Sequence, residues 1–105
     1  SIGNYLIKKS KKVLKEKNSI SIDNSSSDKY SIIKVFANNR TYLLYDILKV
    51  LLNYDLVIYT AKISTYEDFV EDTFHVLKAS GYKINKLTEM KRIEKDIKLK
   101  ALERV

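Results

Sequence analysis

The chain has 105 residues and a formal net charge of +7, from 20 Lys and Arg against 13 Asp and Glu. This length fits one small domain and excludes multidomain machinery. No window approaches the roughly 18 consecutive apolar residues of a membrane span, and the N-terminus has no secretory apolar segment. With no Cys and a single His, disulfides and Cys- or His-based metal centres are also excluded. We therefore expect a soluble, cytoplasmic chain without a cofactor.

The positive charge is concentrated at the two ends. Residues 1–17 carry six Lys and one Glu, residues 86–105 carry seven bases and four acids, and the stretch between carries seven bases and eight acids. Lys outnumbers Arg 17 to 3 and Pro is absent, as the codons of an AT-rich genome would give. The basic charge is therefore weak support for nucleic-acid binding. Because the chain begins at Ser1 without Met, we expect it to be a segment of something longer.

The first third predicts an arm followed by an edge strand. Residues 1–17 have a thin apolar stripe with Lys between, which is typical of a short basic helix or linker. We place the domain boundary near Asn18, with an arm at 1–18 and a folded domain at 19–105. Residues 20–22 alternate between apolar and polar and predict an edge strand, and the Ser-rich run after them is loop material.

The next two elements are a strand and a helix. Residues 30–36 are rich in β-branched and aromatic residues and predict a short buried strand. Residues 41–54 place apolar side chains at three- and four-residue steps, which predicts the clearest helix of the chain. We expect Asn39 to be its N-cap, because an Asn side chain can accept a hydrogen bond from a free helix N–H.

The second half predicts a hairpin and a final helix. Residues 56–65 and 70–77 both alternate and are separated by a short turn, as in an antiparallel hairpin. The alternation puts four residues of the first strand on one face, Val57, Tyr59, Ala61 and Ile63. In the second strand it groups Val70, Asp72, Phe74 and Val76. After a turn at 79–82, Asn85 is expected to cap a helix that runs to Val105, with Met90, Ile93, Ile97 and Ala101 in its stripe.

The order strand, helix, strand, strand, helix predicts an α+β, ferredoxin-like domain with both helices on one face of an antiparallel sheet. A right-handed crossover over the first helix sets the strand at 56–65 parallel to the strand at 30–36, or beside one that is. This plan normally closes with a further strand after the second helix, and the chain has none there. Residues 20–22, residues 82–84 or a strand from a partner could fill that edge.

Five separated segments follow, in order and spacing, the pattern of a known family. Residues 22–24 read I-D-N, and residues 39–47 read N-R-T-Y-L-L-Y-D-I where the family has D-R-P-G-L-L-Y-D-I. Residues 64–66 match its S-T-Y-G, residues 71–76 match its V-D-V-F-Y-V, and residues 81–84 match its G-x-K-I. From residue 20 to about 102, the chain resembles the C-terminal ACT domain of the bacterial PII uridylyltransferase/uridylyl-removing enzymes.

The resemblance implies a regulatory domain that senses an amino acid, with glutamine as the effector, in nitrogen regulation through PII. It implies that the nucleotidyltransferase and hydrolase activities belong to catalytic domains elsewhere in the parent chain. It also implies pairing with a sister ACT domain or a second copy. The ligand-facing turn would be formed by Asn38, Asn39, Arg40, Thr41, Tyr42 and Leu43.

That turn departs from the family pattern. Asn39 replaces its Asp, Thr41 its Pro and Tyr42 its Gly, while Glu67 replaces a turn glycine in the hairpin. Glycine lets a ligand approach the backbone at a helix N-terminus, whereas Tyr42 puts a phenol ring in that space. We therefore expect a degenerate sensor that keeps the fold and has lost tight glutamine binding.

Other candidate residues are better explained as structure. His75 has no catalytic partner in sequence reach and is expected on a strand, facing solvent or a helix. The acids Glu67, Asp68, Glu71 and Asp72 could suggest a metal site, but alternation puts Glu71 and Asp72 on opposite faces, which favours a solvated hairpin rim. No Ser/His/Asp set or phosphate-binding glycine loop is present, so the segment is predicted to be non-catalytic.

Two alternatives remain. RNA-recognition modules share this plan and stack bases on strand aromatics, for which Tyr30, Phe36, Tyr59 and Phe74 are the candidates. The Arg, Lys and Gly pattern of those modules is absent and the middle of the chain is slightly acidic, so the sequence argues against nucleic acid. The second alternative is a purely structural dimerisation module.

Overall fold

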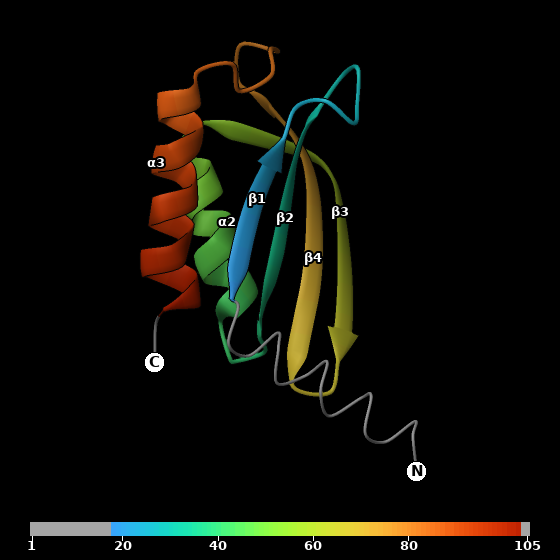
Figure 1. Ribbon diagram of the computed structural model, residues 1–105, viewed down its shortest axis with the longest axis vertical. Coiled ribbons are helices and arrows are strands. Elements are labelled where there is room, and N and C mark those ends of the chain that lie inside the picture. Colours follow the sequence, from blue (N-terminus) through green and yellow to red (C-terminus); the bar gives the residue numbers. More distant parts are fainter. Residues whose placement is uncertain (1–17, 104–105) are drawn as a thin grey trace.

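In a computed structural model of the protein, which describes residues 18–103, two helices lie on one face of a four-stranded sheet (Figure 1). The expected basic arm at 1–17 lies outside the described residues. The elements in chain order are β1 (Ser19–Asp23), β2 (Ser31–Asn38), α2 (Leu43–Asn53), β3 (Leu56–Tyr66), β4 (Phe69–Lys78), α3 (Leu87–Ile97) and the π-helical turn η1 (Lys98–Leu102).

The strand order is β1-β2-β4-β3, and every neighbouring pair is antiparallel. β3 therefore runs parallel to β2 with β4 between them, as the crossover rule predicts. β1 occupies the edge that the ferredoxin-like plan normally fills with a strand after the last helix, pairing Ile20 with Val35 and Ile22 with Ile33. The α+β ferredoxin-like prediction is confirmed. Of the three candidates for the fourth strand, residues 20–22 provide it, and residues 82–84 form no strand.

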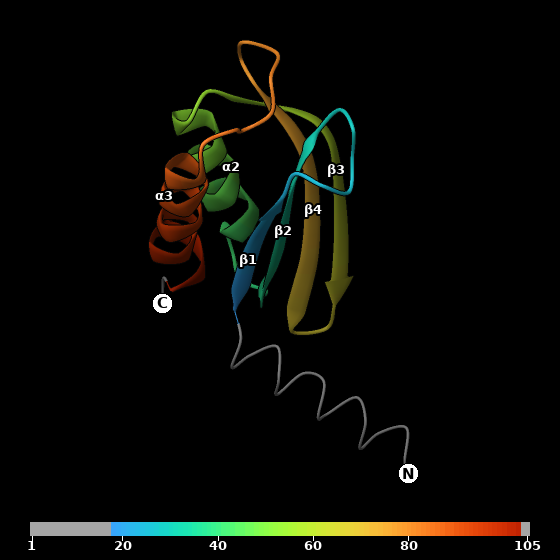
Figure 2. The ribbon, with the colours of Figure 1, turned by 45° about the horizontal axis from the view of Figure 1, so that its top comes forward.

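The core lies between the helices and the inner face of the sheet, and Figure 2 shows both helices on the same side. The predicted alternation of β4 is confirmed, since Val70, Asp72, Phe74 and Val76 are all buried. The helices contribute apolar stripes at helical spacing. Fully buried side chains on these elements include Ile33, Val35, Ile47, Leu51, Phe74, Ile93 and Ile97.

Both helix starts differ from the predictions. α2 begins at Leu43 rather than Thr41, and its N-cap is Tyr42, so Asn39 is not the cap. Instead the Asn39 N–H donates to the Asp68 carbonyl at 2.7 Å, which ties the strand end to the hairpin turn. α3 begins at Leu87 with Lys86 as N-cap and no side-chain cap bond. In both cases the sequence offered a suitable cap, but the backbone path set by the preceding strand or loop decided where the helix begins.

The last helix also ends differently. After α3, the chain continues as η1 to Leu102, and Glu103 closes it by donating its N–H to the Lys98 carbonyl at 2.7 Å. The prediction of one helix to Val105 is therefore wrong for the described part, and Val105 lies outside it. Among the described residues, no helix is both long and apolar enough to cross a membrane.

A β-bulge at Tyr59 breaks the predicted alternation of β3. The Tyr59 ring packs against Tyr30, with ring centroids 5.2 Å apart, on the sheet face that points away from the helices. Ala61 and Ile63 point to the helix side, because they pair with core-facing residues of β4. The prediction that Val57, Tyr59, Ala61 and Ile63 share one face is therefore wrong, because one extra residue reverses the side on which later residues lie.

Candidate functional site

The turn between β2 and α2 brings Tyr42 into the left-handed backbone region. Its φ is 66°, and the Leu43 N–H closes the turn on the Arg40 carbonyl at 3.2 Å. The family has glycine here, a residue for which this conformation carries no steric cost. Glu67, the other position where the family has a turn glycine, also has a positive φ, of 30°. Both positions at which the family has glycine thus have a positive φ, which glycine adopts most readily.

Arg40 links this turn to the end of the chain. Its Nη2 donates to Asp46 Oδ2 at 2.7 Å and to the Ala101 carbonyl at 2.8 Å, and its Nη1 donates to the Thr41 carbonyl at 2.9 Å. The Arg40 side chain is 25% exposed and that of Asp46 is 9% exposed. The guanidinium thus forms a half-buried ion pair that joins the turn, the first turn of α2 and η1.

Beside the turn is an open hollow of about 320 Å³ lined by Arg40, Tyr42, Tyr45 and Asp46. The two tyrosine rings meet edge-on, with centroids 6.4 Å apart. Tyr42 is 73% exposed, so its ring stands at the rim rather than in the core. The hollow combines a cation, a carboxylate and aromatic walls. These are groups that can recognise a zwitterion.

A second hollow of about 210 Å³ continues along α2 toward η1, and Asp46 lines both. Its other lining residues are Lys49, Val50, Asn53 and Lys100. The N-cap residue makes no side-chain hydrogen bond to the start of α2, although the Leu43 N–H already donates to the Arg40 carbonyl. The positive dipole end of this helix lies close to the first hollow.

The structure brings together only part of the predicted ligand turn. Arg40 and Tyr42 line the hollow, and Thr41 is exposed between them. Asn38 and Asn39 instead hold the backbone, since the Asn38 N–H donates to Asn18 Oδ1 at 3.1 Å. Leu43 is buried in the core.

Tyr45 and Asp46 also line the hollow, although the sequence did not predict them as site residues. A usable signal existed, because residues three and four positions after Tyr42 lie on the same face of a helix. The motif L-L-Y-D-I contains both residues; Tyr45 and Asp46 line the hollow, while Leu43 and Ile47 enter the core.

The remaining candidates behave as structural residues. His75 lies on the sheet face away from the helices, with Tyr30 edge-on at 5.8 Å. Asp72 is buried under the helices and Glu71 is on the opposite face, as alternation predicted. Within the described part of the chain, no group of three or more His, Asp or Glu residues could hold a metal ion. Phe74 is fully buried, so it cannot stack on a base.

The I-D-N and G-x-K-I segments have a structural role at the other end of the sheet. The Asp23 carboxylate accepts hydrogen bonds from Ser25 and Ser26, which lower its pKa below the usual range. Asn24 donates to the Ile84 carbonyl, and Lys83 Nζ donates to the Asn24 carbonyl at 2.9 Å. These residues tie the turn after β1 to the segment after β4.

The sheet is four-stranded and antiparallel with two helices on one face, and a hollow lies beside a β-α turn that has a glycine-type conformation. Together these features define a ferredoxin-like domain of the regulatory kind. The family model described as an ACR9-like, ACT-like domain matches residues 19–105. The chain belongs to the ACT-like domain family, and it is an ACT regulatory domain, as the sequence predicted.

Its relatives are longer proteins. The chain is 39% identical over 74 residues to a bifunctional uridylyltransferase/uridylyl-removing enzyme of Zymomonas mobilis, a match that covers 70% of the chain and 8% of that protein. The match to the enzyme of the same name from Ruegeria pomeroyi is 35% identical over 84% of the chain and 10% of the relative. The ACT domain-containing protein ACR3 of Arabidopsis thaliana is 37% identical over 72% of the chain and 16% of its own length. The chain thus spans about a tenth of the bacterial relatives. No solved structure matches.

The strained turn gives a stability prediction. Replacing Tyr42 with Gly should raise the free energy of unfolding by roughly 0.5–1 kcal/mol, because the relieved left-handed strain of about 1–2 kcal/mol exceeds the extra entropy of an unfolded glycine. Urea denaturation measures the change. Tyr42→Ala is the control, since it removes the ring but keeps a Cβ at positive φ. An equal gain in the Ala variant would show that the ring, not the backbone, is responsible.

Proposed function

We propose that this domain is the amino-acid-sensing module of a PII uridylyltransferase-like protein in the cytoplasm, with glutamine as its effector, and that Tyr42 has made the sensor degenerate. The observation that carries the proposal is the hollow at the β2–α2 turn. It lies at the position that the family's turn motif marks, and it is lined by Arg40 and Asp46. The family and its bacterial relatives support the regulatory role.

The groups around the turn suggest how an amino acid would bind. Its carboxylate would accept hydrogen bonds from the first N–H groups of α2, aided by the helix dipole. Its ammonium group would lie near Asp46, whose charge is shared with Arg40 through the 2.7 Å ion pair. The ring of Tyr42 occupies the rim through which such a ligand would enter, and a Cβ at this position already narrows the approach to the backbone.

Calorimetry on variants that restore the family turn tests this function. We expect the natural chain to give no saturable heat with glutamine below about 1 mM, and the variant Asn39→Asp, Thr41→Pro, Tyr42→Gly to bind at least about tenfold more tightly. Glu67→Gly is the matched control, because it restores a family glycine in the hairpin and not at the hollow. Tight binding by the natural chain would contradict the degenerate state. Failure of the restored turn to bind glutamine would contradict the choice of effector.

We further propose that the domain pairs with a sister ACT domain or with a second copy of itself, and that it regulates catalytic domains in a longer parent chain. Residues 1–18 would form the connecting arm. Both edge strands, β1 and β3, leave backbone groups unpaired among the described residues. A purely structural dimerisation role is the alternative. It gains support if no variant of the turn binds an amino acid while the chain still self-associates.

A further inference from the structure

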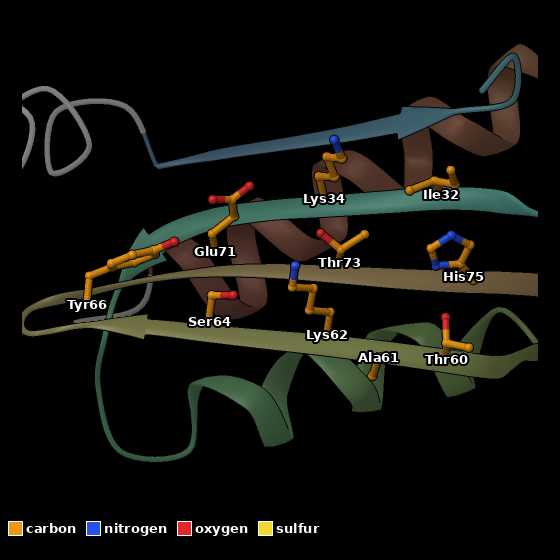
Figure 3. Close-up of a pocket in the computed structure, with 10 residues that line it drawn as sticks. All are labelled: Ile32, Lys34, Thr60, Ala61, Lys62, Ser64, Tyr66, Glu71, Thr73 and His75. Atoms are coloured by element: carbon orange, nitrogen blue, oxygen red, sulfur yellow. The ribbon is translucent and has the colours of Figure 1, made fainter. Parts of the chain in front are cut away.

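The outer face of the sheet, opposite the helices, is uncovered within residues 18–103 (Figure 2). Strand register arranges its side chains in rows across the strands. In the middle row, Lys34 of β2 and Lys62 of β3 both pair with Thr73 of β4, so the two lysines flank one small residue. The next row along β4 carries Glu71, which pairs with Ser64 of β3. Figure 3 shows these side chains on the open face.

Charges in the middle of this face have no partners in the described chain. The three charged side chains are Lys34, Lys62 and Glu71, and no ion pair joins any of them to another residue within 18–103. The side chains surround an open hollow of about 450 Å³ that Lys34, Lys62 and Glu71 help to line. The face thus offers charges of both signs, one row apart, with room above them.

Aromatic side chains lie at both ends of the same face. At one end Tyr59 packs on Tyr30, and at the other Tyr66 stacks on Phe69 with ring centroids 5.0 Å apart. Tyr59 is 50% exposed and Tyr66 is 48% exposed, and Val57 beside the first pair is 44% exposed. Along the strands the order is therefore aromatic, charged, aromatic.

We propose that this outer face packs against the outer face of a second copy of the chain, with the two copies related by a two-fold axis that lies between the sheets and across the strands. Such an axis reverses the strand direction of one copy, so each aromatic end meets the opposite aromatic end of its partner. An axis placed between the lysine row and the Glu71 row sets the lysines of each copy over Glu71 of the other. The pattern is self-complementary, which is what an isologous interface requires.

Charge argues against a polyanion on this face. A groove that tracks single-stranded nucleic acid is lined by basic side chains along its length, whereas the middle of this face has two lysines, Lys34 and Lys62, with Glu71 one row away. The half-exposed rings of Tyr59 and Tyr66 lie on the edge strand β3 and pack on other rings, and Phe36 on the central strand β2 is partly buried beside Glu71. A second copy would bury the aromatic ends of the face and would place opposite charges next to each other. This inference rests on the proposed pairing and not on whether glutamine binds.

A charge swap tests the interface in the full 105-residue chain by sedimentation equilibrium at concentrations up to about 1 mM. We expect a dimer whose dissociation constant rises at least about tenfold for Lys62→Glu and for Glu71→Lys, because each places like charges opposite each other. The triple variant Lys34→Glu, Lys62→Glu, Glu71→Lys reverses all three charges, so it restores opposite charges across the interface and should return to within about threefold of the natural chain. Lys49→Glu on α2 is the matched control and should leave association unchanged.

Each other outcome overturns the proposal. A monomer throughout the concentration range removes the interface. A dimer insensitive to Glu71→Lys would place pairing at a sheet edge, β1 or β3, because Glu71 lies on the central strand β4 and only a contact with the sheet face depends on its charge. Single variants that dissociate without recovery in the triple variant would mean that the charges act within one copy. Circular dichroism of each variant checks that it is folded. A monomer that retains a labelled oligouridylate, with loss of retention in Lys62→Glu, would assign the face to nucleic acid instead.

Discussion

Replacing Arg40 with Gln should lower the free energy of unfolding by about 2–3 kcal/mol, the largest loss we expect from any single change at the turn. The substitution removes the cation from the ion pair with Asp46, whose side chain is only 9% exposed. It also removes the donor to the Ala101 carbonyl, which lies 61 residues further along the chain. Urea denaturation followed by circular dichroism gives the change directly.

The chain contains a matched control for this effect. Lys78 and Glu89 also form an ion pair, at 3.0 Å, but their side chains are 29% and 25% exposed. Because the Glu89 side chain is more exposed than that of Asp46, its charge depends less on the partner cation, and Lys78→Gln should cost less than about 1 kcal/mol. The double variant Arg40→Gln, Asp46→Asn should cost less than the sum of its single changes, since neither then leaves a half-buried charge without its counterion. Equal costs for Arg40→Gln and Lys78→Gln would contradict the structural role of Arg40.

The Arg40 contacts also bear on the proposed sensor. The Arg40 guanidinium that lines the hollow already donates to Asp46, Ala101 and Thr41. A ligand at the hollow would therefore have to share Arg40 with the contacts that hold η1 against α2. Binding and the packing of the last turn of the chain are thus linked through one side chain.

Periodicity was sufficient to predict the elements whose sides are set by local pattern. The alternation of β4 predicted which side chains enter the core, and the three- and four-residue spacing of α2 predicted its buried stripe. These predictions succeed because burial acts on every second residue of a strand and on one face of a helix. The hairpin of β3 and β4 followed from two alternating runs and a short gap.

Features that depend on one residue or on distant contacts could not be predicted in this way. The bulge at Tyr59 shifts the sides of β3, and nothing in its residue types distinguishes it from regular strand. The position of β1 depends on pairing with β2 across a Ser-rich turn. At the site, the left-handed Tyr42 contradicts local preference, and only the family's glycine at that position indicated it. The bond from Arg40 to Ala101 is a tertiary contact without any local signal.

Asp72 gives the second large effect, and it depends on pH. The side chain is 1% exposed on the helix side of β4, and its Oδ1 has no hydrogen-bond partner among the described residues. Burial raises the pKa of Asp72 from 3.8 to about 6, because the charged form is poorly solvated there. Well below pH 3.8 the carboxyl is protonated in both the folded and unfolded states. As the pH rises toward 6, the unfolded state ionises first, so this group's contribution to stability is lost.

Asp72→Asn should therefore leave stability little changed near pH 4 and raise the free energy of unfolding by about 2–3 kcal/mol at pH 7.5, where the natural residue must be buried as an anion. Urea denaturation at several pH values between 4 and 7.5 measures the difference between the two proteins. Glu71→Gln makes the same chemical change on the opposite, solvated face of β4, and in dilute solution it should alter stability by less than about 0.5 kcal/mol. An Asp72→Asn gain that is constant across this pH range would show that amide packing, rather than the buried charge, stabilises the variant.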